Sequence, residues 1–339
     1  MDQTQPKELA PAEPTRNRSP RWLKALQGAI AILSVIFILG SLAKDKDVFL
    51  QAKEIAWHDI AIIIGILLVY FVLHAYRFVL LIEHHCRCRI PLLEWIRMLV
   101  VVRLLNNLVP QMGTIHRGIS LKRDFGVSYT DYIAANLFFI WTDTLLNFAI
   151  AFILFALGAA QLQLFGLSAG NFLGLSLIVI IIAPFLAQRV LGSFKKPLKI
   201  VQKLAEVADQ LTRGLGNLRY MLTTTTIAVA SFLIMTHVFR ILLGAVGAEV
   251  DMATLAVFYA LYRLTFHINI TPGNVGVREI AYGLLCAQAH IGMSKGLLIS
   301  AELRVLSMIV LVTVGVSVAG RQLVGAWRLA RAARRGSSS

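Results

Sequence analysis

Long apolar runs alternate with short polar intervals along most of the chain. Runs of helical length cover residues 21–43, 60–82, 132–159, 170–187, 221–243 and 297–319. Each run is long enough to cross a bilayer as an α-helix, which takes about 20 apolar residues. Residues 1–20 hold several prolines among polar side chains and are predicted to form a disordered tail. The pattern predicts an all-α, polytopic integral membrane protein with about six full spans.

Two further hydrophobic segments are interrupted. They are residues 103–117, RLLNNLVPQMGTIHR, and residues 268–279, INITPGNVGVRE. Both contain Asn-x-x-Pro followed closely by glycine: Asn107, Pro110 and Gly113 in the first, and Asn269, Pro272, Gly273 and Gly276 in the second. A helix cannot run smoothly through these residues, and non-helical backbone at membrane depth must be buried in protein or line a polar cavity. We predict two broken helices; the alternative is two short loops outside the membrane.

The order of these breaks predicts an internal repeat. In each half a span, a break and a second span follow one another, and arginine stands before and after the break. The charged residues are Arg103, Arg117 and Asp143 in the first half, and Arg263, Arg278, Glu279, Glu302 and Arg304 in the second. Corresponding breaks in two halves of a membrane protein indicate a shared binding site. We therefore expect the two breaks to approach each other near the membrane midplane.

Composition agrees with a membrane protein, and the charge distribution orients it. The chain is 57% hydrophobic and 15% charged, with a net charge of +15. Basic side chains gather in both tails and in residues 83–97, 117–123 and 189–219, whereas residues 160–170 and 244–254 contain no Lys or Arg. The positive-inside rule then places both termini in the cytoplasm, in the cell (inner) membrane. With this orientation each break must enter and leave the membrane on the same side, the first from the cytoplasm and the second from the opposite face. The two halves then form an inverted repeat, which is typical of alternating-access transporters.

The net positive charge does not indicate nucleic-acid binding, because no nucleic-acid-binding motif accompanies it. Apolar residues recur every three or four positions within residues 189–220, which predicts an amphipathic helix with a basic face on an anionic leaflet. Packing on the protein's own cytoplasmic side is the alternative. We expect no cofactor, since His84, His85, Cys86 and Cys88 are too closely spaced for a metal site and lack a second ligand cluster.

The charges at the breaks indicate an anionic ligand. Five arginines and only three acids lie in or beside the broken segments and the spans that follow them. Positive charge therefore stays unpaired unless an anion fills the cavity between the breaks. The arginine fork suits phosphate, and half-helix N-termini would add backbone donors. Snorkelling of some arginines to the interface is the alternative. The predicted substrate-binding set is Arg103, Asn107, Pro110, Gly113, Arg117, Asp143, Arg263, Asn269, Pro272, Gly273, Gly276, Arg278, Glu279, Glu302 and Arg304.

Residues 272–279, PGNVGVRE, with Arg304 in the following span, resemble the P-G-G-x-G-x-x-E motif of the flippase-like family. This family comprises the transmembrane region of lysylphosphatidylglycerol synthases and their stand-alone relatives. Residues 107–113, NLVPQMG, and Asp143 are similar to its earlier motif N-x-L-P-x-R-x-G-E and downstream aspartate. The resemblance covers about residues 20–325, so we expect a transmembrane domain at 21–325 between the tail 1–20 and a basic tail 326–339.

Two departures from the family bear on the substrate. The arginine of the earlier motif is missing, and Thr114 stands where the family has glutamate. A cationic lysyl head group would need that acid, so the resemblance points away from aminoacylated phosphatidylglycerol. The synthases also carry a soluble acyltransferase domain, which we expect this chain to lack.

These features predict a flippase or transporter, not an enzyme, for an anionic lipid such as a polyprenyl-phosphate-linked sugar or a phospholipid. Glu279 would hold an arginine, and Arg304 would meet the lipid phosphate or pair with Asp143. One alternative is a non-catalytic partner that tethers a glycosyltransferase through residues 189–219. The other is an intramembrane lipid-phosphate enzyme, for which only Glu279 and Glu302 are candidate carboxylates.

Overall fold

A computed structural model describes residues 56–158, 161–192, 218–267 and 270–336, together with three isolated positions, Ile32, Ile36 and Gly40. The predicted tail 1–20, nearly all of the first span 21–43, and residues 193–217 of the basic interval lie outside these residues. Within them, five helices are long and apolar enough to cross a membrane. They correspond to the second through sixth predicted spans, so an all-α polytopic fold is confirmed for this part of the chain.

The first half contains four helices in the order long, short, short, long. They are α3 (Trp57–Cys86), α4 (Leu92–Leu108), α5 (Met112–Phe125) and α6 (Tyr129–Leu157). Ser128 precedes α6, and its hydroxyl accepts a hydrogen bond from the backbone N–H of Asp131 at 3.1 Å, which caps the helix. The predicted first interruption is a real break, but only residues 109–111 are non-helical.

The second half repeats this order around its own break. Its elements are α9 (Leu218–Ala245), α10 (Met252–Leu264), the short 3₁₀ helix η2 (Pro272–Asn274), α11 (Val277–Gln288) and α12 (Met293–Gly336). Asp251 caps α10 by accepting the backbone N–H of Thr254 at 2.9 Å. The predicted second interruption is therefore also a real break, and it separates α10 from α11.

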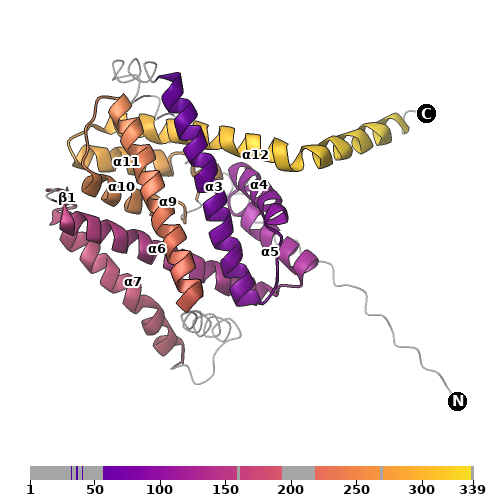
Figure 1. Cartoon of the computed structure of the whole chain (residues 1–339), viewed down its shortest axis with the longest axis horizontal. Helices are drawn as coiled ribbons and strands as arrows, with labels where there is room; N and C mark the ends of the chain where they lie inside the picture. Colours follow the sequence, from indigo (N-terminus) through magenta and orange to yellow (C-terminus); the bar gives the residue numbers. More distant parts are fainter. Residues whose placement is uncertain are drawn as a thin grey trace.

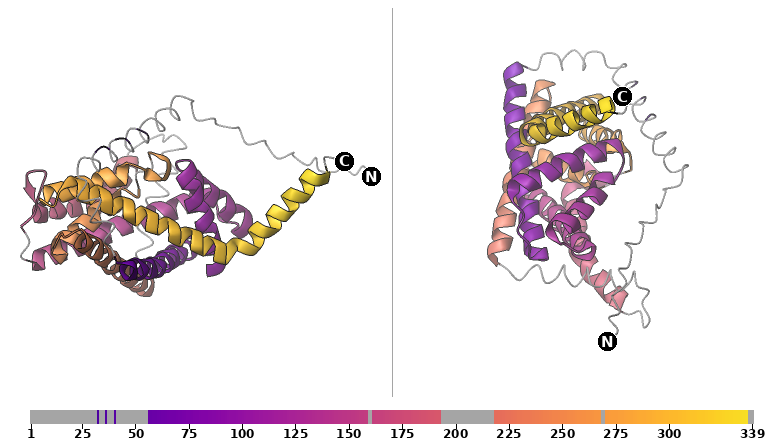
Figure 2. Two further views of the ribbon diagram at one scale, coloured as in Figure 1. Left: turned by 90° about the horizontal axis from the view of Figure 1, so that it is seen from above. Right: turned by 90° about the vertical axis from the view of Figure 1, so that its right-hand side faces the viewer.

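Helix packing follows the same correspondence. By position in the two halves, α3 corresponds to α9, α4 to α10, α5 to α11 and α6 to α12. The contact between α4 and α12 has its counterpart between α10 and α6, and the contact between α3 and α12 has its counterpart between α9 and α6. The long helices α3 and α9 lie side by side and run in opposite directions (Figure 1). Seen from the side, α3 and α9 form one wall of the bundle, and α4 and α12 lie behind it (Figure 2). The short helices α4 and α10 thus each pack against long helices of both halves.

One helix stands outside this correspondence. A two-strand hairpin, β1 (Gln163–Leu164) and β2 (Leu167–Ser168), leads into α7 (Ala169–Gly192), which packs on α6 at the edge of the bundle (Figure 1). Pro184 lies inside α7 and has no N–H for the carbonyl of Ile180. Trp141 of α6 donates its indole N–H to that carbonyl at 2.9 Å, which satisfies the group and ties α7 to α6.

Candidate functional site

A cavity of about 450 Å³ lies where the two breaks meet. All four helices of the first half and α9, α10, α11 and α12 of the second contribute to its wall. The breaks touch directly, because a Cβ placed on Gly273 would lie 2.7 Å from Oδ1 of Asn107 and 3.5 Å from its Cα. The predicted approach of the two breaks is therefore confirmed. Their depth in the bilayer stays a prediction.

The first break depends on a close contact between α4 and α5. Gln111 adopts a left-handed backbone conformation with φ of 62°, which reverses the chain direction before α5. Gly113 donates its N–H to Oδ1 of Asn106 at 2.8 Å, and a Cβ at this position would collide with the carbonyl oxygen of Val102. Glycine is therefore required here by the close approach of two backbones.

The second break is closed by an acid and an arginine. Glu279 accepts the N–H of Gly276 at 2.8 Å through one oxygen and Nε of Arg304 at 2.6 Å through the other. Arg304 also donates to the carbonyls of Gly273 at 2.7 Å and Asn274 at 2.9 Å. Glu279 therefore holds an arginine, as predicted. The predicted pairing of Arg304 with Asp143 is wrong, because the α12 register places Arg304 over the break loop.

Asp143 instead joins arginines from both halves of the molecule. One of its oxygens lies 2.5 Å from Nη1 of Arg77 on α3, and the other lies 2.9 Å from Nε of Arg263 on α10. His267 lies 3.9 Å from the second oxygen. Only 2% of Asp143 is exposed. A buried charge of this kind is tolerated only with such partners.

Three cavity arginines have no carboxylate partner among the residues described. Arg103 lies over the ring of Phe71 with its Cζ 4.7 Å from the ring centroid. Arg278 lies 3.9 Å from the centroid of Phe266, and its buried Nε has no hydrogen-bond acceptor. The third, Arg117, donates only to neutral acceptors, Tyr132 Oη and Asn136 Oδ1, each at 2.8 Å. These three side chains therefore bring positive charge to the cavity without a direct carboxylate contact.

The structure separates the predicted site residues into groups. Those that line the cavity are Arg103, Asn107, Arg117, Arg263, Gly273, Arg278 and Arg304. Those behind the wall that shape the breaks or hold an arginine are Pro110, Gly113, Asp143, Pro272, Gly276 and Glu279. Asn269 lies outside the described residues. Glu302 is not brought to the cavity, and its buried Oε2 has no hydrogen-bond partner in the described part of the chain.

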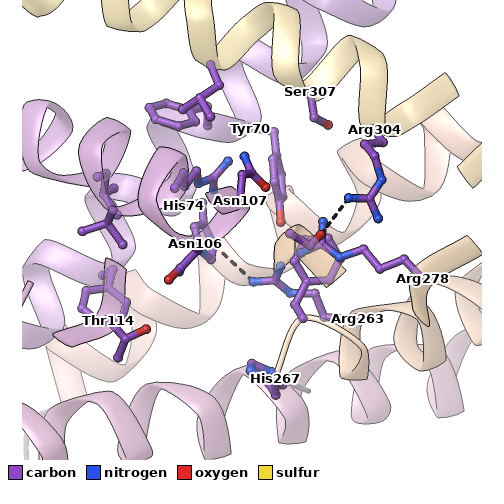
Figure 3. A pocket seen from close by; sticks show the side chains of 18 of the residues that line it. Tyr70, His74, Asn106, Asn107, Thr114, Arg263, His267, Arg278, Arg304 and Ser307 are labelled. Carbon is purple, nitrogen blue, oxygen red and sulfur yellow. Dashed lines mark hydrogen bonds between the residues drawn. The ribbon is translucent and has the colours of Figure 1, made fainter. Parts of the chain in front are cut away.

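Sequence reasoning missed the contribution of α3. Tyr70 and His74 face the cavity from successive turns, and His74 Nδ1 lies 3.4 Å from Nη2 of Arg263 (Figure 3). Arg77 follows one turn later and binds Asp143. A signal was present, because Arg77 is a charge inside an apolar run, the same criterion that selected Asp143.

The wall carries cations and neutral polar groups. Five arginines line it, and no Asp or Glu of the described residues does. Within those residues no group of three or more His, Cys, Asp or Glu is arranged to hold a metal ion. Outside the spans, burial raises the pKa of the Cys88 thiol, which disfavours the thiolate form that a metal requires. The arrangement is therefore suited to an organic or inorganic anion.

The bundle defines a polytopic membrane protein with an arginine-lined cavity where two broken helical segments meet. Over residues 25–315 the sequence matches the family described as Lysylphosphatidylglycerol synthase TM region. Since the match spans most of the chain, the protein belongs to this family, as the two break motifs predicted. No protein of curated function and no solved structure matches the chain.

Proposed function

We propose that this protein is a flippase or transporter that moves an anionic, phosphate-bearing lipid between the leaflets of the cell membrane. The observation that carries the proposal is the wall of the cavity, with five arginines and no carboxylate within the part of the chain described. Charge at membrane depth is costly, so a cluster of it marks a functional pathway. Guanidinium groups without acid partners favour a bound phosphate.

The arrangement of helices supports transport over simple binding. The two halves share one element order, their packing contacts correspond, and α3 and α9 run in opposite directions. We interpret this as an inverted repeat in which α4–α5 and α10–α11 are re-entrant segments. When the two halves of an inverted repeat rock against each other, the binding site between them is exposed to each leaflet in turn. The charge bias of the loops supports an orientation with both termini in the cytoplasm.

The size of the cavity fits a head group and leaves the lipid tails outside. Pockets for small ligands measure about 300–1,000 Å³, and this cavity of about 450 Å³ falls in that range. The outward faces of the long helices are apolar, with Val69, Ile153 and Val305 all about half exposed. Acyl or polyprenyl chains would remain against such faces while the phosphate enters the cavity.

The contacts do not favour an intramembrane enzyme. Glu279 and Glu302 were the candidate carboxylates, but Glu279 is committed to Arg304 and Gly276, and Glu302 does not reach the cavity. Paired carboxylates or an activated nucleophile are needed for such chemistry. The alternative of a tethering partner for a glycosyltransferase depends on residues 189–219, most of which lie outside the described residues.

The proposal is tested with the full chain in proteoliposomes that contain acyl-labelled phosphatidylglycerol. Flipping is followed as the fraction of label reduced by external dithionite. We expect the protein to accelerate flipping, and Arg103→Gln and Arg278→Gln each to lower the initial rate about tenfold or more, since each removes a phosphate-binding cation. Neither substitution breaks an ion pair, so both variants should fold normally.

Arg123→Gln is the matched control, because Arg123 is exposed and pairs only with its neighbour Asp124. It should flip lipid at the wild-type rate. Wild-type rates in the Arg103→Gln/Arg278→Gln double variant would show that phosphate is not bound by these arginines. If the unaltered protein does not accelerate flipping but retains a glycosyltransferase in membranes, the tethering alternative replaces the proposal.

A further inference from the structure

Every phenylalanine on the cavity wall already has a guanidinium over its ring. The pairs, with the distance from Cζ to the ring centroid, are Arg103 and Phe71 (4.7 Å), Arg117 and Phe78 (4.4 Å), Arg77 and Phe139 (5.1 Å), and Arg278 (3.9 Å) and Arg263 (4.9 Å) with Phe266. Proteins hold quaternary ammonium groups with aromatic rings of this kind. On these four rings a choline group would have to displace arginines that the fold itself supplies, which leaves the rings of Tyr70, Tyr259 and Tyr262 on the wall.

A carboxylate is the second means of holding an amine, and the cavity offers none. Asp143 and Glu279 are each only 2% exposed, and both are occupied by arginine. The remaining guanidiniums make the cavity strongly positive, and like charges brought together cost several kcal/mol. An amine-bearing head group would therefore meet repulsion without compensation.

Neutral amides and hydroxyls line the cavity on the side of the first break. These side chains are Asn106, Asn107, Gln111, Thr114 and, from α12, Ser307. Figure 3 shows Asn106 and Thr114 across the cavity from Arg263 and Arg278. Amide groups both donate and accept hydrogen bonds, which matches the hydroxyl groups of a polyol. Arg103 and Arg117 belong to the same two helices, α4 and α5, so the wall places hydroxyl-binding groups beside phosphate-binding ones.

We infer that the cavity selects a lipid phosphate whose head group is a neutral polyol, namely glycerol, inositol or a sugar, and rejects head groups that carry an amine. This inference rests on the proposed function and names its substrate class. The arginines bind the phosphate, and the amides of the first break bind hydroxyl groups. Exclusion of amines follows from the positive charge of the wall, the lack of a lining acid and the arginines over the phenylalanine rings.

The test uses four lipid probes with the same labelled acyl chain in proteoliposomes that hold the full chain. Phosphatidylglycerol and phosphatidylinositol carry polyols, whereas phosphatidylethanolamine and lysylphosphatidylglycerol carry amines. We expect the polyol lipids to flip about tenfold faster or more, because selectivity is a difference in binding free energy that includes repulsion of the wrong ligand. A preference between glycerol and inositol would identify which polyol the cavity fits. Equal rates for all four probes would overturn the inference and leave the flippase function intact.

A separate binding measurement distinguishes failure of the transport function from failure of the head-group preference. Native mass spectrometry of the detergent-solubilised protein reports which of the same four lipids stays bound. Retention of the polyol lipids over the amine lipids without any flipping would support the inference as a binding preference and reject the transport function. Equal retention of all four would reject the inference whether or not lipid is flipped.

A single substitution tests whether the amide side chains of the first break determine which head group is selected. Asn106→Asp introduces a carboxylate of nearly the same shape, which can still accept the N–H of Gly113 that Asn106 accepts at 2.8 Å. We expect it to lower the ratio of phosphatidylglycerol to phosphatidylethanolamine flipping about fivefold or more, because an acid now compensates the amine. Asn171→Asp, an exposed position on α7 outside the cavity, should leave the ratio unchanged. A wild-type ratio in Asn106→Asp would contradict the inference.

Discussion

Glu279 of α11 and Arg304 of α12 meet beside the second break and hold its backbone in place. Their side chains meet at 2.6 Å between Oε1 and Nε, although 25 residues separate them in sequence. Glu279 also caps α11 through the N–H of Gly276, and Arg304 spans two carbonyls of the break. The non-helical backbone is thus fixed by side chains, which supplies the hydrogen bonds that lipid cannot.

Replacing Glu279 by glutamine should destabilise the protein. Arg304 would keep its charge and lose its carboxylate, and breaking a buried pair costs about 3–5 kcal/mol. Thermal unfolding in detergent should show a large fall in Tm. Glu302→Gln is the control on the same helical hairpin, because Oε2 of Glu302 has no partner among the described residues. A fall in Tm as large for Glu302→Gln would show that the pair with Arg304 is not the cause.

Arg304→Lys should lose stability as well as transport. If Arg304 bound lipid phosphate alone, lysine would insert normally and only transport would fall. Stability should fall too, because three nitrogens of the guanidinium each donate to a different protein acceptor. A lysine ammonium is a single point on a flexible stem and cannot reproduce this fork. Normal Tm with lost flipping in Arg304→Lys would return Arg304 to the phosphate site.

The first break is sensitive to one methyl group. Gly113→Ala would place a Cβ against the carbonyl oxygen of Val102 and close to Oδ1 of Asn106. We expect a loss of about 1–3 kcal/mol from overpacking, seen as a lower Tm and reduced flipping. Gly65→Ala is the matched control, because its Cβ would meet nothing within 4 Å in the middle of α3. Alanine there should be neutral or stabilising by up to about 1 kcal/mol.

The spans and breaks could be predicted because they depend on local properties. An apolar run of about 20 residues has few structural options in a membrane, and proline followed by glycine interrupts a helix wherever it occurs. The motif match at Pro272 and Glu279 likewise located the second break. The contact between Asn107 and Gly273 followed from the correspondence of the two halves, without any knowledge of side-chain packing.

The direction in which each charged side chain points could not be predicted. Successive residues on a helix are about 100° apart, so a small rotation of α12 decides which of Glu302, Leu303 and Arg304 faces the cavity. The observed rotation selects Leu303 and Arg304 and turns Glu302 away. The pairing of Asp143 with Arg77 rather than with Arg304 depends on the packing of α3 against α6. The spacing of residues in the sequence specifies neither the rotation of α12 nor the packing of α3 against α6.

The orientation in the membrane is tested by cysteine labelling. We expect Phe165→Cys, at the exposed tip of the β1–β2 hairpin, to react with an impermeant maleimide in intact cells. Arg123→Cys should react only after permeabilisation, because it lies in a basic interval that the positive-inside rule assigns to the cytoplasm. Both variants are made with Cys86, Cys88 and Cys286 replaced by serine. Labelling of position 165 only after permeabilisation would reverse the orientation.

Asp143 should couple strongly to Arg77 and to Arg263. Asp143→Asn would leave two buried guanidiniums without a carboxylate, so we expect a loss of about 3–5 kcal/mol or failure to accumulate in the membrane. Adding Arg77→Gln removes one of those charges and should recover part of the lost Tm.

A double-mutant cycle makes this prediction quantitative. Residues that share an ion pair show coupling energies of about 0.5–3 kcal/mol, whereas residues without a shared contact are nearly additive. Asp143→Asn should therefore be non-additive with Arg77→Gln. The same substitution should be much closer to additive with Arg103→Gln, because Arg103 stacks on Phe71 and makes no ion pair with Asp143. Additivity in the Arg77 cycle would mean that Asp143 does not hold α3 in place. Non-additivity with Arg77 alone would identify Asp143 as the residue that fixes α3 and α6 beside the cavity while Arg103 is left for the ligand.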